Sequence, residues 1–182
     1  MSIVITGTPG VGKHTITDIV SKKLNLTPID ITQVARNSSH IERNSGIDEI
    51  DVEKLGSFLQ ERISEENIVV GHLAPYVLSK KNVKRMIILR RNPYDLISVY
   101  KERKYSERKI KENTGSEILG VIAYDALTKF QEKARQLDVS KKTIKQVANE
   151  VIKIILEEKG TEEVDWLEYV TKNNDLKKFF DD

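Results

Sequence analysis

Apolar positions along the chain fall into two patterns: short continuous runs, and stretches in which they recur every three or four residues. The runs predict buried β-strands and the recurring pattern predicts amphipathic α-helices. The predicted strands cover residues 2–6, 28–31, 68–70 and 86–89. The predicted helices are one that ends near residue 24 and others over residues 32–39, 52–64, 93–103, 106–137 and around 147–155. Short buried strands that alternate with helices predict an α/β fold, with a parallel sheet covered by helices on both faces.

Three further segments carry weaker patterns. Residues 40–51 lack apolar periodicity and contain Gly46, so we expect a loop there, with Asp51 as the N-cap of the following helix. Residues 75–78 predict a turn of helix, and residues 164–180 predict two short helices in a charged tail. The chain of 182 residues has no low-complexity linker, which predicts one domain over residues 1–182.

A glycine-rich stretch, Gly-Thr-Pro-Gly-Val-Gly-Lys at residues 7–13, separates the first predicted strand from the first predicted helix. Glycines let the backbone curl until successive N–H groups point at phosphate oxygens, and the helix adds its positive end. Lys13 would bridge the outer phosphates of a nucleoside triphosphate. The strict motif has Ser or Thr after this lysine, whereas here His14 follows and the hydroxyl comes at Thr15. A structural glycine turn is the alternative, but the strand–loop–helix order favours a phosphate-binding loop (P-loop).

Polar residues also follow two other predicted strands, as Gly71-His72 and Arg90-Arg91. The carboxyl ends of parallel strands meet at one edge of a sheet, so we expect these residues and the loop to line one cleft. His72 is either a phosphate or water contact or a buried histidine, and Arg90 is either a phosphate ligand or an ion-paired strand end. The hydroxyl of Thr15 either contacts phosphate or a metal-bound water, or bonds back into its own helix.

Composition narrows the class of protein. A formal net charge of +2 gives no argument for a nucleic-acid partner, and the absence of cysteine excludes disulfides and thiolate metal sites. No apolar run is long enough for a transmembrane helix, and the first predicted strand leaves no room for a signal peptide. We therefore expect a soluble, cytoplasmic protein that does not bind membranes.

Several stretches carry a family resemblance. They are the glycine loop, residues 47–55 (Ile-Asp-Glu-Ile-Asp-Val-Glu-Lys-Leu), Leu89-Arg90, residues 105–113 (Tyr-Ser-Glu-Arg-Lys-Ile-Lys-Glu-Asn) and residues 117–119 (Glu-Ile-Leu). Over about residues 1–158 the chain resembles the adenylate kinase isoenzyme 6 family, and its arrangement and length resemble an archaeal member. Members of that family are small nucleoside monophosphate kinases, also described as ATPases of ribosomal small-subunit biogenesis. Many NTPases share the loop, whereas the stretch at 105–113 is much more selective.

The resemblance implies which residues bind ATP. Those that match the cradle of the ATP phosphates are Gly10, Val11, Gly12, Lys13, His14 and Thr15. Thr15 would contact Mg²⁺ through water, since Mg²⁺ accompanies ATP as the implied cofactor. Residues 102–112 match a short lid whose Arg103 binds ATP, and Lys141 matches a lysine near the adenine.

The resemblance also implies a site for AMP, which becomes ADP. Residues 30–51 match a monophosphate-binding insert, and Asp30, Arg36 and His72 are the implied AMP contacts. With Lys13, both Arg36 and Arg103 are implied as catalytic, because forked guanidinium groups suit phosphate oxygens. A solvated helix face is the alternative reading of each arginine.

Three positions depart from the family pattern. Val70 stands two residues before His72, where relatives often have an acid that orients Mg²⁺ or its waters. Val99 stands where many relatives have a second arginine, and Lys104 replaces a glycine before Tyr105. These departures leave open how Mg²⁺ is held, how strongly the donor nucleotide binds and how stiff the hinge of the lid is.

The sequence thus supports two main functional hypotheses. The first is an adenylate kinase that transfers a phosphoryl group from ATP to AMP with Mg²⁺. The second, which the resemblance implies, is an ATPase switch that binds a small-subunit ribosomal protein during ribosome assembly. A kinase for another monophosphate or a small metabolite is a weaker third hypothesis, because the loop residues of the insert do not reveal which base it selects.

Overall fold

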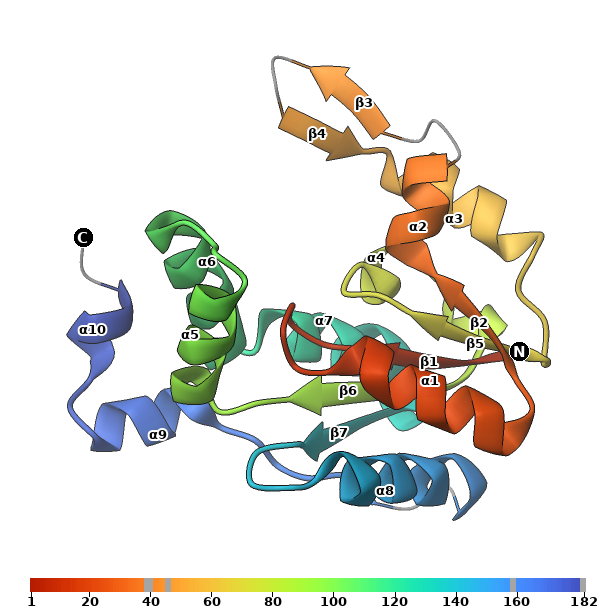
Figure 1. Ribbon diagram of the computed structural model, residues 1–182. Helices are drawn as coiled ribbons and strands as arrows, with labels where there is room; N and C mark the ends of the chain where they lie inside the picture. Colours follow the sequence, from red (N-terminus) through yellow and green to blue (C-terminus); the bar gives the residue numbers. More distant parts are fainter. Residues whose placement is uncertain (38–40, 45–46, 158–159, 181–182) are drawn as a thin grey trace.

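The computed structural model describes residues 1–37, 41–44, 47–157 and 160–180, and Figure 1 shows their arrangement. The central sheet consists of β1 (Ser2–Thr6), β2 (Thr27–Asp30), β5 (Asn67–Val70), β6 (Val83–Arg90) and β7 (Ala134–Asp138). The strand order is β2-β5-β1-β6-β7, and every neighbouring pair is parallel. The carboxyl end of the central strand β1 therefore leads directly into the glycine loop, at the edge where such sheets bind ligands.

Helices cover both faces of this sheet, which explains why its central strands are continuous apolar runs. Alternate residues of β1 point to opposite faces, so Ile3 and Ile5 belong to one core and Val4 to the other. The first core is closed by α1 (Lys13–Leu24) and α8 (Ile144–Glu157). The second core is closed by α3 (Val52–Gln60), α4 (Ala74–Val77) and α7 (Val121–Phe130). These observations confirm the predicted α/β class.

A third, smaller core fastens the C-terminal segment to the rest of the molecule. It lies among α5 (Pro93–Glu102), α6 (Glu107–Ile118), α9 (Trp166–Lys172) and α10 (Leu176–Phe180). Figure 1 shows α9 and α10 beside α5 and α6. Its buried members are Ile118, Trp166, Val170 and Phe179. The two short helices predicted for the tail are confirmed, and they pack onto the domain.

A two-stranded hairpin projects from the body above α2 (Ile31–Asn37) in Figure 1. Its strands β3 (Ile41–Asn44) and β4 (Ile47–Ile50) pair antiparallel. The prediction of a loop over residues 40–51 is therefore wrong where the structure describes it, while residues 40, 45 and 46 lie outside the described residues. Each strand has four residues and no run of apolar positions, so the hydrophobic pattern does not predict the hairpin. The predicted N-cap is confirmed, since Asp51 accepts a hydrogen bond from the backbone of Lys54 at 2.9 Å.

The prediction of one helix over residues 106–137 is also wrong. The chain forms α6, breaks at Gly120, continues as α7 and then enters β7. Gly120 has a φ of 64°, in the left-handed region that ends a right-handed helix. In the edge strand β7 only Ala134 and Leu137 are buried, so it shows no apolar run. In the described part of the chain no helix combines the length and the apolar character that a membrane crossing requires.

Candidate phosphate-binding site

The loop between β1 and α1 has the backbone curvature that a phosphate cradle needs. Gly10 and Gly12 have φ values of 91° and 98°, which side chains other than glycine rarely adopt. Gly10 also lies against the ring of Tyr100, whose Cε1 atom would be 2.8 Å from an added Cβ. The hydroxyl of Tyr100 donates to the carbonyl of Pro9 at 2.5 Å. Because Tyr100 is fully buried in α5, that helix fixes the middle of the loop.

Lys13 is the first residue of α1 and its side chain is 5% exposed. Its Nζ donates to the carbonyl of Thr8 at 2.9 Å, so the ammonium is held inside the curl of the loop. Burial lowers the pKa of Lys13 from its usual value to about 8, and Arg103 adds to this lowering, whereas the charges of Glu117 and Asp30 oppose it. The site therefore lacks a full counter-charge for this ammonium, which a polyphosphate would supply.

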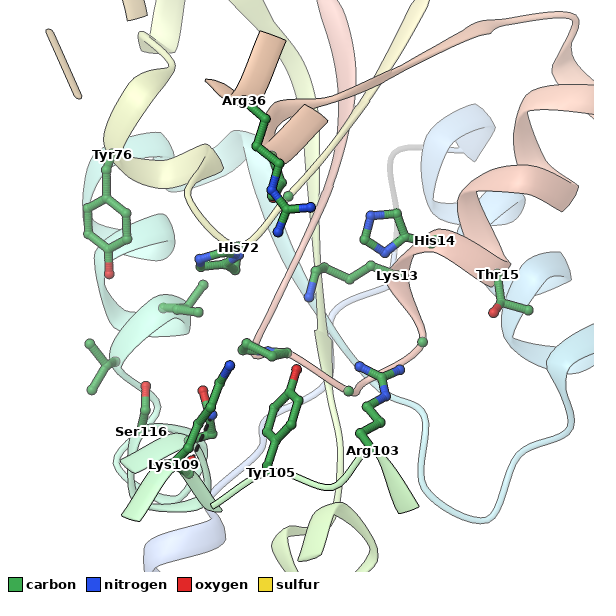
Figure 2. A pocket seen from close by; sticks show the side chains of 18 residues that line it. Lys13, His14, Thr15, Arg36, His72, Tyr76, Arg103, Tyr105, Lys109 and Ser116 are labelled. Atoms are coloured by element: carbon green, nitrogen blue, oxygen red, sulfur yellow. Dashed lines mark hydrogen bonds between the residues drawn. The ribbon is translucent and has the colours of Figure 1, made fainter. Parts of the chain in front are cut away.

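A cavity of about 580 Å³ opens over the loop. It is lined by the loop and by side chains from α2, the end of β5, the end of α5 and α6. Figure 2 shows Arg36 and Arg103 reaching toward the loop from opposite sides, with His72 between Arg36 and Tyr105. The structure thus brings Lys13, Arg36, Arg103 and His72 to one cavity.

His14 and Asp30 form a pair at the rim of this cavity, with His14 Nε2 and Asp30 Oδ2 2.9 Å apart. The other oxygen of Asp30 accepts from the backbone of Thr32 at 2.8 Å and so begins α2. Burial, followed by the charge of Lys13, lowers the pKa of His72, which favours the neutral form of its imidazole. Thr15 is exposed and lines this cavity too, and it lies on α1 to the right of His14 in Figure 2.

A second cavity, of about 330 Å³, lies on the other side of the loop. Its lining includes Val11, Val99 and Arg103, together with apolar residues of the β7–α8 region. Lys141, expected near the adenine, lines neither cavity, whereas its neighbour Lys142 lines this one. The ammonium of Lys142 contacts Glu150 at 2.8 Å and Glu162 at 2.7 Å.

Several cavity residues carried no clear signal in the sequence. Tyr105 lines the first cavity and stacks on Tyr100, with ring centroids 5.4 Å apart, and the ammonium of Lys109 lies 4.1 Å from the centroid of the Tyr105 ring. Tyr76 from α4 lines the same cavity, and its hydroxyl donates to Asp125 at 2.7 Å. Residues 101–111 are densely basic, and their spacing alone does not show that α6 turns Lys109 toward the cavity.

Two of the departures from the family pattern have clear surroundings. Val70 is buried at the end of β5, where it pairs in register with Asp30 of β2, so the nearest strand supplies an acid at the same level. Lys104 has a φ of 55°, a backbone conformation that favours glycine. Arg90, left open from the sequence, is 3% exposed and ion-paired with Glu117 at 2.9 Å, so it is a buried strand end.

The parallel sheet, the curled glycine loop and the buried lysine together define a P-loop NTPase fold. A family model described as "AAA domain" matches residues 3–120. A protein of Methanococcus maripaludis named "Putative adenylate kinase" is 34% identical over 92% of this chain and 96% of its own. Proteins of the same name from Saccharolobus solfataricus and Thermococcus onnurineus are 33% and 32% identical, over 84% and 94% of this chain and 82% and 94% of theirs. The chain belongs to the P-loop nucleoside monophosphate kinase family that contains these relatives.

Solved structures support the fold independently of sequence. A gluconokinase from Sinorhizobium meliloti superposes with a TM-score of 0.58 at 14% identity, over 86% of this chain and 91% of its own. A shikimate kinase from Bacteroides thetaiotaomicron superposes with a TM-score of 0.55 at 19% identity, over 86% of this chain and 98% of its own. At such identities the likeness concerns the fold alone, and it is the fold of P-loop kinases.

Proposed function

We propose that this protein transfers the γ-phosphoryl group of ATP to AMP in a Mg²⁺-dependent reaction that gives two ADP. The observation that carries the proposal is the meeting of Lys13, Arg36 and Arg103 at one cavity over the glycine loop. The kinase relatives support a nucleotide substrate. In the transfer, the bond between the γ-phosphorus and its bridging oxygen breaks, and a bond to a phosphate oxygen of AMP forms.

The protein's part in such a transfer is alignment and charge stabilisation. The backbone of Gly10, Val11, Gly12, Lys13, His14 and Thr15 would hold the triphosphate of ATP. The ammonium of Lys13 would leave the carbonyl of Thr8 and follow the charge on the transferred group. Arg36 would bind the phosphate of AMP, with Asp30 and His72 beside it, while Arg103 would bind ATP from the opposite side.

Two segments are assigned to the substrates. Residues 30–51 form the monophosphate-binding insert, and residues 102–112, which run from the end of α5 into the first half of α6, form a short lid. Closure of the lid would exclude water, which otherwise competes with AMP as acceptor. The adenine of ATP is assigned to the second cavity, where Val99, Val139 and Ile144 supply an apolar lining. Lys141 remains an implied neighbour of that adenine.

Mg²⁺ fits this site as a companion of the nucleotide. No group of three His, Cys, Asp or Glu side chains that could hold a metal ion occurs among the described residues. Mg²⁺ in kinase sites is held mainly by phosphates and waters with one or two protein oxygens. Asp30 and, through water, Thr15 would supply those oxygens. Bound to ATP, the ion would neutralise charge on the β- and γ-phosphates.

Arginine variants test the two sides of the site separately. We expect Arg36→Ala to lower kcat/KM for AMP about a hundredfold while the Kd for Mg·ATP stays within about twofold. Arg103→Ala should instead weaken Mg·ATP. Arg62→Ala, a surface arginine that donates to the carbonyl of Phe58, is the matched control and should change neither constant. Equal losses for both substrates in both variants would contradict the assignment.

Repeating the assay with CMP, GMP and UMP in place of AMP tests the proposed preference for AMP.

The ATPase switch with a ribosomal-protein partner is the second candidate. Val70 at the end of β5 favours it, because relatives often have an acid at this position; Mg²⁺ would here depend on Asp30 of the neighbouring strand, and phosphoryl transfer would be slower. This candidate predicts ATP hydrolysis that AMP does not accelerate. Recovery of a small-subunit ribosomal protein in an ATP-dependent pull-down would support it, and recovery of none with or without ATP would argue against it.

A further inference from the structure

Glu117 is a buried carboxylate that the proposed reaction leaves without a role. It lies in the last turn of α6 and is 1% exposed. Its oxygens accept hydrogen bonds from the Thr8 hydroxyl at 2.5 Å, the Arg90 guanidinium at 2.9 Å, the Arg91 backbone at 3.0 Å and the Trp166 indole at 3.2 Å. These donors come from the glycine loop, the end of β6 and α9. Three distant parts of the chain therefore meet at one side chain of α6.

Glu117 accepts more hydrogen bonds than are needed to offset the burial of its charge. Burying a carboxylate is costly, and a well-placed guanidinium offsets that cost. Arg90 does this, and it is itself held by the carbonyl of Glu117 at 2.8 Å and by Gln136 at 2.7 Å. The bonds to Thr8 and Trp166 are additional, and each ties a separate segment to this fixed ion pair.

Thr8 links the carboxylate to the phosphate-binding lysine. Its hydroxyl donates to Glu117 Oε2, while its carbonyl accepts from Lys13 Nζ at 2.9 Å. Both ends of the residue are thus engaged, and Thr8 is only 2% exposed. A shift of the carboxylate would move the loop backbone and the resting position of the ammonium together.

We propose that Glu117 is a positioning residue that holds the phosphate-binding loop in its binding-competent shape through Thr8. The C-terminal segment takes part through Trp166, whose indole N–H shares the Glu117 oxygen that Arg90 contacts. The third core, which contains Trp166 and Ile118, keeps that end of α6 in place. The inference rests on the proposed function only for its kinetic readout, because the affinity for Mg·ATP is measured without turnover.

The test compares Thr8→Val, which keeps the shape of the side chain and removes the hydroxyl, with Thr8→Ser, which keeps the hydroxyl. We expect Thr8→Val to weaken Mg·ATP binding about tenfold, as for loss of a hydrogen bond to a charged group. The Kd of the Thr8→Ser variant for Mg·ATP should stay within about twofold of the wild type. The KM for AMP should hardly change in either variant. Melting temperatures check that each variant is folded. For the Glu117→Gln variant used next, Glu157→Gln, at an exposed acid on α8, controls for the loss of one charge.

A double-mutant cycle with Glu117→Gln then separates positioning from a general structural role. In the Glu117→Gln background, Thr8→Val should cost less than about twofold, because the bond it removes is already altered. The inference would be overturned if the losses of Mg·ATP affinity from the two substitutions multiply in the double mutant. It would also be overturned if the Thr8→Val variant binds Mg·ATP as tightly as the wild type. If Glu117→Gln does not fold, the Thr8 pair alone decides. A wild type that fails to bind Mg·ATP would instead overturn the proposed function.

Discussion

Lys13 has a buried ammonium whose main polar contact is a neutral carbonyl. Desolvation by burial is the largest of the effects on its pKa, which falls to about 8. Such a group destabilises the folded chain until an anion enters, so the same feature that prepares the site for a polyphosphate reduces the stability of the free protein. Two predictions follow from this one side chain.

Lys13→Met should raise the free energy of unfolding at pH 7 by about 2 kcal/mol, because it removes a buried charge. Below pH 8 Lys13 is protonated in both the folded and the unfolded chain, and the full cost is present. Between pH 8 and its ordinary value of 10.5 the folded protein loses the proton first, so the advantage of the variant should shrink as pH rises. Urea denaturation at pH 7 and pH 10 measures this.

Lys153→Met is the control for that comparison, because Lys153 is exposed on α8 and its ammonium lies 3.9 Å from the carboxylate of Glu157. Its unfolding free energy should stay within about 0.5 kcal/mol of the wild type at both pH values. A Lys13→Met protein less stable than the wild type at pH 7 would show that the ammonium is better compensated than its contacts indicate.

The same pKa predicts an alkaline limit for activity. The profile of kcat/KM for ATP against pH reports the free enzyme, in which Lys13 must be protonated to attract the triphosphate. We expect kcat/KM to fall above about pH 8, approaching tenfold per pH unit. A profile that stays flat to pH 9.5 would mean that this ammonium is not needed in its charged form.

At the scale of elements, breaks in the chain decide how the site is assembled. Gly120 ends α6 and begins α7 with a φ of 64°, beside the guanidinium of Arg90. The turn places Glu117 under the glycine loop and starts α7 along the second face of the sheet. One continuous helix could not do both.

Gly120→Ala should lower the free energy of unfolding by about 1–2 kcal/mol, because a Cβ is unfavourable at positive φ. Gly120→Asn should lower it less, since asparagine tolerates this region and Asn25 and Asn174 occupy it in the same chain. Thermal or urea denaturation measures both variants. Equal stability of the alanine variant and the wild type would contradict the view that φ at this position limits the choice of residue.

The sequence predicts the elements with strong local patterns and misses those defined by distant contacts. Buried strands such as β1 and β6 are continuous apolar runs, so their position and type were predictable. The edge strand β7 was not, because only Ala134 and Leu137 face the core. The break at Gly120 was hidden by helical periodicity on both sides, since a single glycine within such a pattern is often tolerated.

At the scale of the whole molecule, the parallel sheet brings the carboxyl ends of its strands to one edge, where the glycine loop and His72 line one cavity as expected, whereas Arg90 does not line it. Periodicity could not tell which side chains would face the cavity. Arg90 turned inward to Glu117, whereas Tyr105 and Lys109 line the cavity. The roles of Lys13, Arg36 and Arg103 stay predictions that their common cavity supports.

The most direct test of the central claim follows the γ-phosphoryl group itself. Purified protein is mixed with Mg·ATP labelled at the γ-phosphate, with and without AMP, and the label is traced. Label should appear in newly formed ADP only when AMP is present. Lys13→Ala should abolish this transfer. Label that appears only as inorganic phosphate, at a rate that AMP does not change, would contradict the account.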